Sequence, residues 1–361
     1  MQLYKNNSRS FFSVVCCIVL VCTFISACDS TRETVYKEQL FVFGTIVEIS
    51  IWGEQPQKAK QATAELAEDF KFMHRVWSPR ARGSLGRMNN LFPSKVAFTG
   101  SPSVLAMLEK ARKLSDQSNK LFNPAIGKLI QLWDFNQENQ NQVNKAPREL
   151  PDPKAIADLL SHNPTLDNLH LDGISIRSDN TALLLDFGAI AKGYGIDLAI
   201  DKLREMGINN AIINAGGDLR AIGKRGDRNW HIGIRHPRQQ GMIASLEIIK
   251  DESIFTSGDY ERFFEYQGKR YHHILDPRTG YPAEGVVSVT VIDHDAAVAD
   301  AAATALFIAG PEQWYDIAKS MGLKWVMLID KDMKIHMNPA MARRIKFELD
   351  ESPDIKLSPP L

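Results

Sequence analysis

A run of seventeen residues without a charge, from Phe11 to Ala27, constrains this chain more than any other stretch of its sequence. Lys5 and Arg9 precede the run, and no acidic residue stands before it. A basic start followed by an apolar stretch is typical of a secretory signal. The run also reaches the lower length limit for a helix that crosses a hydrocarbon core of about 30 Å, so the alternative is a transmembrane anchor.

The end of the run decides between these two interpretations. Ile25-Ser26-Ala27-Cys28 resembles the lipobox of bacterial lipoproteins, in which a Cys is lipidated and becomes the first mature residue. We therefore predict a lipoprotein signal peptide at residues 1–27, lipidation at Cys28 and a polar tether over 28–38. Asp29 resembles a retention signal for the inner membrane, so we expect the protein on the periplasmic side of that membrane.

Removing the signal changes the composition that matters. The full chain has 43 Lys+Arg and 43 Asp+Glu, whereas the mature chain keeps 41 bases against 43 acids, a net charge of about −2. A chain this close to neutral has no electrostatic footprint for nucleic acid. The only remaining cysteine is Cys28, which excludes a disulfide and thiol catalysis in the exported protein.

The mature chain mixes helical and strand patterns without regular alternation and without an internal repeat. This mixture predicts an α+β fold in one two-lobed domain over residues 39–349. Residues 39–51 read as one strand with Gly44 as a bulge, and Leu183–Asp186 read as a second strand. The Pro-rich residues 350–361 predict a disordered tail.

Two glycine-containing segments are candidates for anion binding. In LLLDFGAIAKGYGID (residues 183–197), a helix begins just after Asp186, and the free N–H groups at such a start favour anions. Lys192 adds a cation there. The alternative is that the segment is only a junction between a strand and a helix, with Asp186 as the helix cap. In INAGGDLRAIG (residues 213–223), Gly216-Gly217 can form a backbone nest or simply a hairpin turn.

Two further segments carry groups suited to catalysis and metal binding. Residues 255–285 are dense in polar side chains, and His273 among them can act as a general base, while His272 faces the other side of its strand. Asp300 and Thr304 are four apart in an Ala-rich helix and share a face, and their hard oxygens suit Mg²⁺. The alternative for the first segment is that its polar residues simply form turns. The alternative for the second is a Thr that hydrogen-bonds to a backbone carbonyl and an Asp that is merely exposed.

Together these segments resemble one family. In their order along the chain, with Phe43-Gly44-Thr45 before them and LFNPAIGKLIQLW at 121–133, they are similar to the ApbE family of FAD:protein FMN transferases over residues 40–330. The resemblance implies a mixed fold with FAD in the cleft between two lobes and Mg²⁺ at its pyrophosphate. It also implies transfer of FMN to a Thr or Ser of a target protein, with release of AMP. Membrane redox subunits of the Na⁺-translocating NADH:quinone reductase or Rnf complexes are the implied targets.

The resemblance also implies roles for single residues. The metal would be held by Asp300, Thr304 and the backbone carbonyl of Ala189, and His273 would be the base. The predicted contacts to FAD are Phe43, Trp77, Leu121, Phe122, Asn123, Asp186, Lys192, Gly216, Gly217, Asp259 and Ile274.

The implied target carries an acceptor motif of the form Asp-x-x-Ser/Thr-Gly-Ala/Ser-Thr. Residues 276–280 of this chain begin in the same way but continue with Tyr281-Pro282 and lack the terminal Thr, so we expect no autoflavinylation. Two alternatives stay open at this point: an FAD pyrophosphatase that yields FMN and AMP, and a flavin-binding lipoprotein without enzymatic activity.

Overall fold

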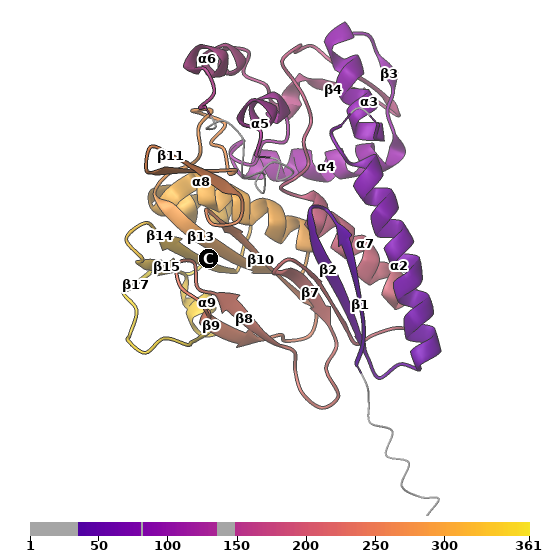
Figure 1. Cartoon of the computed structure of the whole chain (residues 1–361), viewed down its shortest axis with the longest axis vertical. Helices are drawn as coiled ribbons and strands as arrows, with labels where there is room; N and C mark the ends of the chain where they lie inside the picture. The colour runs from indigo at the N-terminus through magenta and orange to yellow at the C-terminus, as the bar shows by residue number, and fades with distance from the viewer. Residues whose placement is uncertain (1–34, 81, 136–148) are drawn as a thin grey trace, which may run out of the picture. The chain divides into compact units, whose positions relative to one another are not determined.

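The computed structural model describes residues 35–80, 82–135 and 149–361 (Figure 1). The predicted signal peptide at 1–27 and the lipidation site Cys28 lie outside these residues. Within them, Tyr36–Leu361 form one compact unit by their internal contacts, so the predicted lobes are not separate bodies. Strands and helices are mixed as expected, and the α+β class is confirmed.

A nine-stranded sheet forms the centre of the unit, in the order β1-β2-β6-β7-β10-β13-β14-β15-β17. Neighbours from β2 to β15 are antiparallel, and β17 joins β15 in parallel. The strands are β1 (Val35–Val42), β2 (Thr45–Trp52), β6 (Ala211–Ala215), β7 (Asp218–Ile222), β10 (Glu252–Gly258), β13 (Val286–Asp293), β14 (Trp325–Asp330), β15 (Ile335–Met337) and β17 (Ile355–Leu357).

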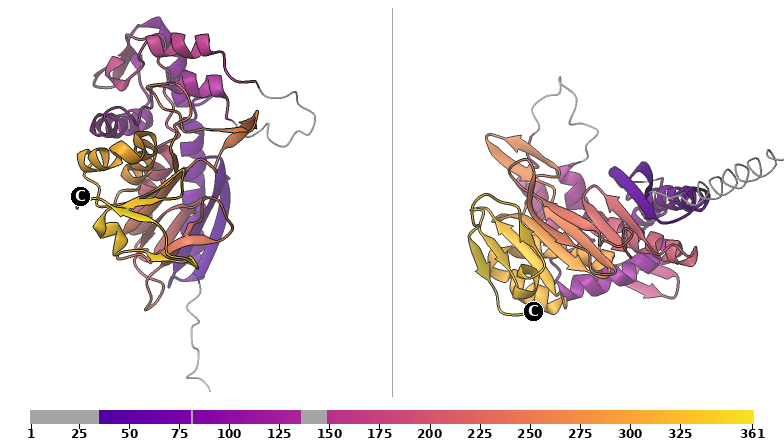
Figure 2. Two further views of the ribbon diagram at one scale, coloured as in Figure 1. Left: turned by 90° about the vertical axis from the view of Figure 1, so that its left-hand side faces the viewer. Right: turned by 90° about the horizontal axis from the view of Figure 1, so that it is seen from below.

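Both faces of this sheet are covered, which explains why β13 is apolar almost throughout (Figure 2). On one face, Val289 and Val291 pack with the helices α2 (Pro56–Val76), α7 (Ala191–Glu205) and α8 (Ala296–Ser320). On the other face, Ile292 packs with a small sheet of order β16-β9-β8. The strands of that sheet are β8 (His231–Arg235), β9 (Met242–Glu247) and β16 (Lys346–Phe347).

Most of the remaining elements surround the helical face and the upper end of the sheet in Figure 1, whereas α9 lies beside β9 and packs Met341 against the small sheet. The remaining elements are α3 (Ser84–Leu91), η1 (Phe92–Ser94), β3 (Phe98–Thr99), α4 (Pro102–Gln117), α5 (Gly127–Trp133), α6 (Pro153–Ser161), η3 (Leu166–Asn168), β4 (Leu169–Asp172), β5 (Ser175–Ser178), β11 (Phe263–Tyr266), β12 (Lys269–His272) and α9 (Pro339–Ala342). No helix among the described residues is long and apolar enough to cross a membrane.

The N-terminal boundary differs from the prediction. Residues 39–51 are not one strand but part of a hairpin, because Phe43 (φ 54°) and Gly44 (φ 75°) both have positive φ, as the two central residues of a type I′ turn require. The hairpin begins at Val35, so the last residues of the predicted tether 28–38 belong to the sheet.

The C-terminal boundary also differs. Residues 350–361 are not a disordered tail, because Ile355–Leu357 form β17 and pair with Ile335–Met337. The unpaired edge of β15 offers backbone donors and acceptors, and the tail satisfies them. The hydroxyl of Tyr315 also donates to the carbonyl of Pro360 (3.1 Å). The domain therefore extends beyond residue 349.

Candidate active site

The segment before α7 is held by backbone hydrogen bonds to residues 124–127 and by the side chain of Asn89. Leu183–Asp186 were predicted as a strand, yet only Leu184 makes a bridge, to Ile126. Asn89 supplies the partner for the residue between: its side chain accepts the N–H of Leu185 and donates to the carbonyl of Leu185, both at 2.8 Å. The segment is therefore extended and paired with residues 124–127, but the pairing amounts to one parallel bridge and not to a regular strand.

Lys192, in the first turn of α7, forms an ion pair with Asp218 at the start of β7. The other carboxylate oxygen of Asp218 accepts the N–H of Thr256 (2.9 Å). Burial would lower the pKa of Lys192, but the charges of Asp218 and Asp300 outweigh it and raise that pKa. The ammonium group therefore stays charged. Sequence reasoning missed Asp218, although it directly follows the glycine pair.

The glycine pair forms the turn between β6 and β7. Gly216 (φ 70°) and Gly217 (φ 107°) have backbone conformations that favour glycine, and the side chain of Asn214 accepts the N–H of Gly217 (2.8 Å). A Cβ on Gly216 would lie only 2.3 Å from the hydroxyl of Thr45. The pair is thus the hairpin turn that was the alternative, and its contact with FAD stays a prediction.

Asp300 lies at the interface of α7 and α8. The backbone N–H of Gly193 donates to its Oδ2 (2.9 Å), and a Cβ on Gly193 would lie 2.2 Å from the carbonyl of Ala296, so only glycine permits this approach. Burial raises the pKa of Asp300 to about 7; Lys192 opposes this shift and Asp218 adds to it. A buried carboxylate of this kind gains when a cation binds it.

Thr304 lies one turn further along the same helix, as the spacing of four predicted. Its hydroxyl is 3.3 Å from that of Ser257 at the end of β10. Ala189 lies in the turn before α7. Among residues 35–80, 82–135 and 149–361, no group of three or more His, Cys, Asp or Glu side chains could hold a metal. A metal at Asp300 would therefore depend on hydroxyl and carbonyl oxygens as well.

His273 follows β12 and is fixed by a single carbonyl. Its backbone N–H donates to the carbonyl of Arg262 (3.0 Å), and its Nδ1 lies 3.3 Å from the same oxygen. Because a carbonyl only accepts, Nδ1 carries the proton and Nε2 keeps its lone pair. Burial lowers the pKa of His273 well below its ordinary value, and the charges of Arg262 and His272 lower it further. The ring is therefore neutral near pH 7, as a base must be.

His272 faces away from this position, as strand alternation predicted. Its Nε2 donates to the carbonyl of Ala283 (2.8 Å), and its Nδ1 accepts the N–H of Ile274 (3.3 Å). The ring also packs edge-on against Phe307, with 5.3 Å between centroids. Both nitrogens of His272 are thus used in holding the chain, and neither is available for catalysis.

The charge of Arg262 acts on three groups of the site, namely His273, Lys192 and Asp186. Its charge lowers the pKa of His273 and acts on Lys192 as well. Burial raises the pKa of Asp186, while a hydrogen bond from the N–H of Gly188 (2.7 Å) and the charge of Arg262 oppose that rise. Sequence reasoning did not single out Arg262. Its role depends on burial, which the sequence does not reveal.

Two aromatic rings lie beside the start of α7. Phe43, in the β1–β2 turn, stacks on Trp77 with 6.3 Å between centroids and 11° between planes, and Tyr194 meets Trp77 edge-on at 5.6 Å. A Cβ on Gly195 would approach Phe43 to 3.3 Å. The buried indole N–H of Trp77 has no hydrogen-bond partner in the described part of the chain. An orphaned donor of this kind costs about 1–3 kcal/mol, so it fits a ligand that brings an acceptor.

The other predicted contacts are occupied within the protein. Leu121 and Phe122 are buried in the core, and Ile274 is 5% exposed. The side chain of Asn123 donates to the carbonyl of Pro164 (2.9 Å) and accepts the N–H of Ala125 (3.0 Å). Asp259 forms a bidentate ion pair with Arg238, in which Nη1 and Nη2 donate to Oδ1 and Oδ2 at 2.7 and 2.6 Å. These side chains are engaged within the protein and share no hydrogen bond or ion pair with the charged groups of Lys192, Asp218 and Asp300.

Comparisons with known proteins agree with this geometry. The model of the ApbE family matches residues 43–327. The chain is 38% identical over 310 residues to an FAD:protein FMN transferase of Rhodobacter capsulatus, across 86% of this chain, and spans 58% of the length of that relative. It is 30% identical to the FAD:protein FMN transferase of Treponema pallidum, covering 94% of this chain and 97% of the relative.

Solved structures show the same fold. The ApbE protein of Thermotoga maritima superposes with a TM-score of 0.75 at 30% identity, over 84% of this chain and 96% of that protein. The flavin transferase ApbE of Vibrio cholerae superposes with a TM-score of 0.74 at 26% identity, over 87% of this chain and all of that one.

Proposed function

Because this chain belongs to the ApbE family of FAD:protein FMN transferases, we propose that it transfers the FMN half of FAD to a Thr or Ser hydroxyl of a target protein, with Mg²⁺ at the pyrophosphate. The observation that carries the proposal is the pairing of two features in one region. Asp300 is a buried carboxylate whose pKa stays raised although the charge of Lys192 opposes the rise, and His273 is neutral with no hydrogen bond to its Nε2 from any described residue.

The reaction balances without a further reactant. The acceptor oxygen forms a bond to the phosphorus of the FMN half, and the bond from that phosphorus to the bridging oxygen breaks. The bridging oxygen leaves with AMP. The proton of the acceptor hydroxyl moves to Nε2 of His273, a step typically worth about 10²–10⁴-fold in rate. The hydrogen bond from Nδ1 to the carbonyl of Arg262 keeps the ring in the tautomer that can take this proton.

The proposed metal ligands are the carboxylate of Asp300, the hydroxyl of Thr304 and the backbone carbonyl of Ala189. Oxygen donors with one carboxylate suit Mg²⁺, which keeps few protein ligands and completes its shell with phosphate and water. When bound, Mg²⁺ supplies positive charge that offsets the charge on the phosphates and the departing AMP. Lys192, held charged by Asp218, adds a fixed cation beside the same carboxylate.

The aromatic pair supplies the surface for FAD in this proposal. Phe43 and Trp77 offer flat faces, and the orphaned indole N–H offers a donor. We propose that residues 121–123, Asp186, Gly216-Gly217 and Ile274 approach FAD mainly through their backbone, since their side chains are buried or bonded elsewhere. Asp259 also stays a proposed contact, with its carboxylate held in place by Arg238.

One experiment separates transfer from hydrolysis. The protein is incubated with FAD, Mg²⁺ and a soluble domain that carries an Asp-x-x-Ser-Gly-Ala-Thr segment, and flavin fluorescence is read in a denaturing gel. Fluorescence on the domain, lost when its terminal Thr is changed to Val, supports the proposal. FMN and AMP in solution with a dark domain would instead establish an FAD pyrophosphatase.

We also propose that the enzyme is anchored by lipid at Cys28 on the periplasmic side of the inner membrane and acts on membrane redox subunits there. The support is the lipobox-like end of the apolar run, followed by Asp29. Labelled palmitate should be incorporated into the wild-type protein and not into the Cys28→Ala variant, which should fractionate with soluble proteins. An unlabelled wild type would contradict the anchor.

A further inference from the structure

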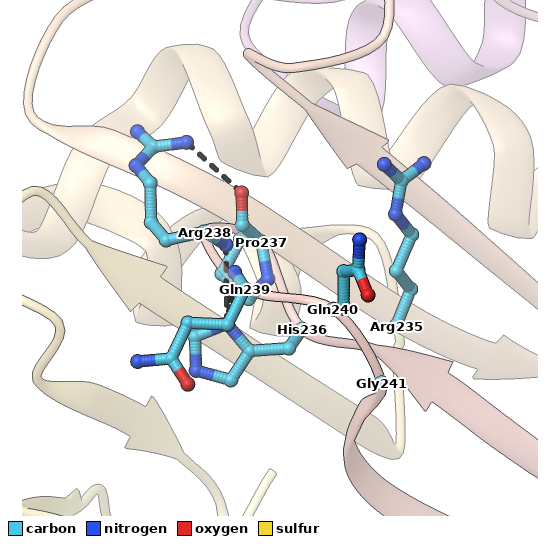
Figure 3. A pocket seen from close by; sticks show the side chains of 7 residues that line it. All are labelled: Arg235, His236, Pro237, Arg238, Gln239, Gln240 and Gly241. Atoms are coloured by element: carbon cyan, nitrogen blue, oxygen red, sulfur yellow. Dashed lines mark hydrogen bonds between the residues drawn. The ribbon is translucent and has the colours of Figure 1, made fainter.

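A pocket lies in the loop between β8 and β9, outside the residues used so far. It is lined by residues 235–241 (Figure 3). The loop has an ordered frame, because the N–H of His236 donates to the carbonyl of Gly241 (3.0 Å). The buried ring of His236 then accepts two backbone N–H groups, from Arg238 (3.1 Å) and Gln239 (3.0 Å). A loop fixed by its own side chain can present groups in defined positions.

Two arginines line this pocket, and their surroundings differ. Arg238 donates two hydrogen bonds to Asp259, so its charge is neutralised within the protein. Arg235 is exposed and lies over the ring of Tyr260, 5.2 Å from the centroid. Within the described residues it has neither an ion pair nor a hydrogen bond from its guanidinium. Figure 3 shows the two side chains on opposite sides of the pocket.

The ring under Arg235 is held in place by the strand that leads to the active site. A Cβ on Gly258, the last residue of β10, would lie 2.5 Å from the ring of Tyr260, so the ring fills the space that glycine leaves. The preceding residue, Ser257, contacts the proposed metal ligand Thr304. Tyr260 is therefore a fixed platform three residues from that contact.

Arg235 also belongs electrostatically to the active-site region. Burial raises the pKa of Glu261, and the positive charges of Lys192 and Arg235 both oppose that rise. Glu261 directly follows Tyr260 in the chain, and its carboxyl feels the charges of both Lys192 and Arg235.

We propose that the pocket of residues 235–241 binds the aspartate carboxylate of the acceptor segment of the target protein, with Arg235 as its ion-pairing group. This inference rests on the proposed function. A guanidinium backed by an aromatic ring keeps its N–H edge free for a carboxylate, which it can meet through two hydrogen bonds. Its exposure suits a macromolecular partner. The pyrophosphate of FAD is the other anion that could use it, and the test distinguishes the two.

The test is a double-mutant cycle. The first member is Arg235→Gln in the full-length enzyme, and the second is an Asp→Asn change in a soluble domain that carries Asp-Gly-Ala-Ser-Gly-Ala-Thr. Arg225→Gln is the matched control, because Arg225 is also exposed and lies over an aromatic ring, Trp52, at 5.5 Å. Steady-state transfer, hydrolysis of FAD without the domain, and FAD affinity are measured for each variant.

Arg235→Gln should raise KM for the domain about tenfold with little change in kcat, as expected when a charged pair at an interface is removed. It should leave FAD affinity and hydrolysis unchanged. The same loss should follow from the Asp→Asn domain, with no further loss when both changes are combined. The Arg225→Gln control should match the wild type. The KM of the wild type should rise with ionic strength more steeply than that of the variant.

Other outcomes overturn the inference. If the two losses multiply when both changes are combined, or if KM is unchanged, Arg235 does not recognise this segment. A parallel fall in FAD affinity would assign Arg235 to the pyrophosphate. A wild-type enzyme that hydrolyses FAD and labels no domain would overturn the proposed function and this inference together, whereas equal labelling by wild type and variant would overturn only the inference.

Discussion

Two clusters of buried charge lie where α7, β7 and α8 meet, and they differ in how completely their groups are partnered. The Arg220 cluster comprises Arg220 on β7, Asp197 on α7 and Asp251. Three nitrogens of Arg220 donate to the two carboxylates. Asp197 also accepts the backbone N–H groups of Ala296 (2.9 Å) and Ala297 (3.0 Å) at the start of α8. This cluster joins the helices and leaves little for a ligand.

The Lys192 cluster comprises Lys192 on α7, Asp218 on β7 and Asp300 on α8. Lys192 has one ion pair, and Asp300 accepts the N–H of Gly193. Asp218 and Arg220 are two apart on β7, so strand alternation places them on the same face. The same three elements therefore build two neighbouring clusters. The Arg220 cluster is closed, because its groups are well partnered, and the Lys192 cluster is open, because its groups have fewer partners. Incomplete partnering, and not burial or charge alone, marks the site.

The largest expected effect comes from changing one acid in each cluster. Asp300→Asn should reduce transfer by at least about 10³-fold, because the metal loses its charged ligand and several kcal/mol of charge stabilisation with it. Asp197→Asn should keep transfer near the wild-type level. Rates are compared over a Mg²⁺ titration. An Asp300→Asn enzyme that works at low Mg²⁺ would remove Asp300 from the metal site, and equal losses in both variants would erase the contrast between the clusters.

The neighbouring histidines repeat this contrast on a smaller scale. His273→Ala should lower transfer by about 10²–10⁴-fold, since the base is lost, while FAD affinity stays near that of the wild type. His272→Gln should instead lower the free energy of unfolding by about 1–3 kcal/mol, because buried hydrogen bonds are disturbed, and should retain transfer below the unfolding temperature. FAD affinity is measured by flavin fluorescence quenching. A parallel fall in FAD affinity for His273→Ala would make that ring a binding group.

The third prediction concerns pH and the closed cluster. Burial raises the pKa of Asp197 to about 6; the charge of Asp295 adds to this rise and Arg220 opposes it. The folded state therefore binds the proton more tightly than the unfolded state, and this group contributes stability that falls as pH rises from about 4 to 6. The free energy of unfolding of Asp197→Asn, relative to the wild type, should rise by roughly 2–3 kcal/mol across that window. Urea titrations at several pH values measure it, and a constant difference between the two proteins would show that Asp197 is ionised without cost.

The smallest expected effect is the absence of self-modification. Residues 276–280 form a closed turn, in which the N–H of Gly280 donates to the carbonyl of Asp276 (2.8 Å) and Arg278 pairs with the Asp276 carboxylate. The acceptor-like segment also lacks the terminal Thr. The intact mass of the protein after incubation with FAD and Mg²⁺ should show no added FMN. A covalent flavin would mean that this turn can open and reach the Lys192 cluster.

The sequence predicted the parts of the site that depend on local spacing. The interval of four placed Asp300 and Thr304 on one helix, and strand alternation gave the rings of His272 and His273 different partners. These predictions succeeded because helical and strand periodicity is fixed by the backbone itself. The order of motifs also indicated the ApbE family, which the comparisons show.

The tertiary structure decided which charged groups are satisfied. Asn89, Asp218 and Arg262 escaped prediction because their partners lie far along the chain or because burial gives them their effect. The same reason explains residues 183–186, which pair with residues 124–127 and with the side chain of Asn89, and the tail, which completes the edge of β15. Residue types and periodicity are properties of the sequence. Desolvation and hydrogen-bond completion arise only when distant segments pack, and here they separate the open Lys192 cluster from the closed Arg220 cluster.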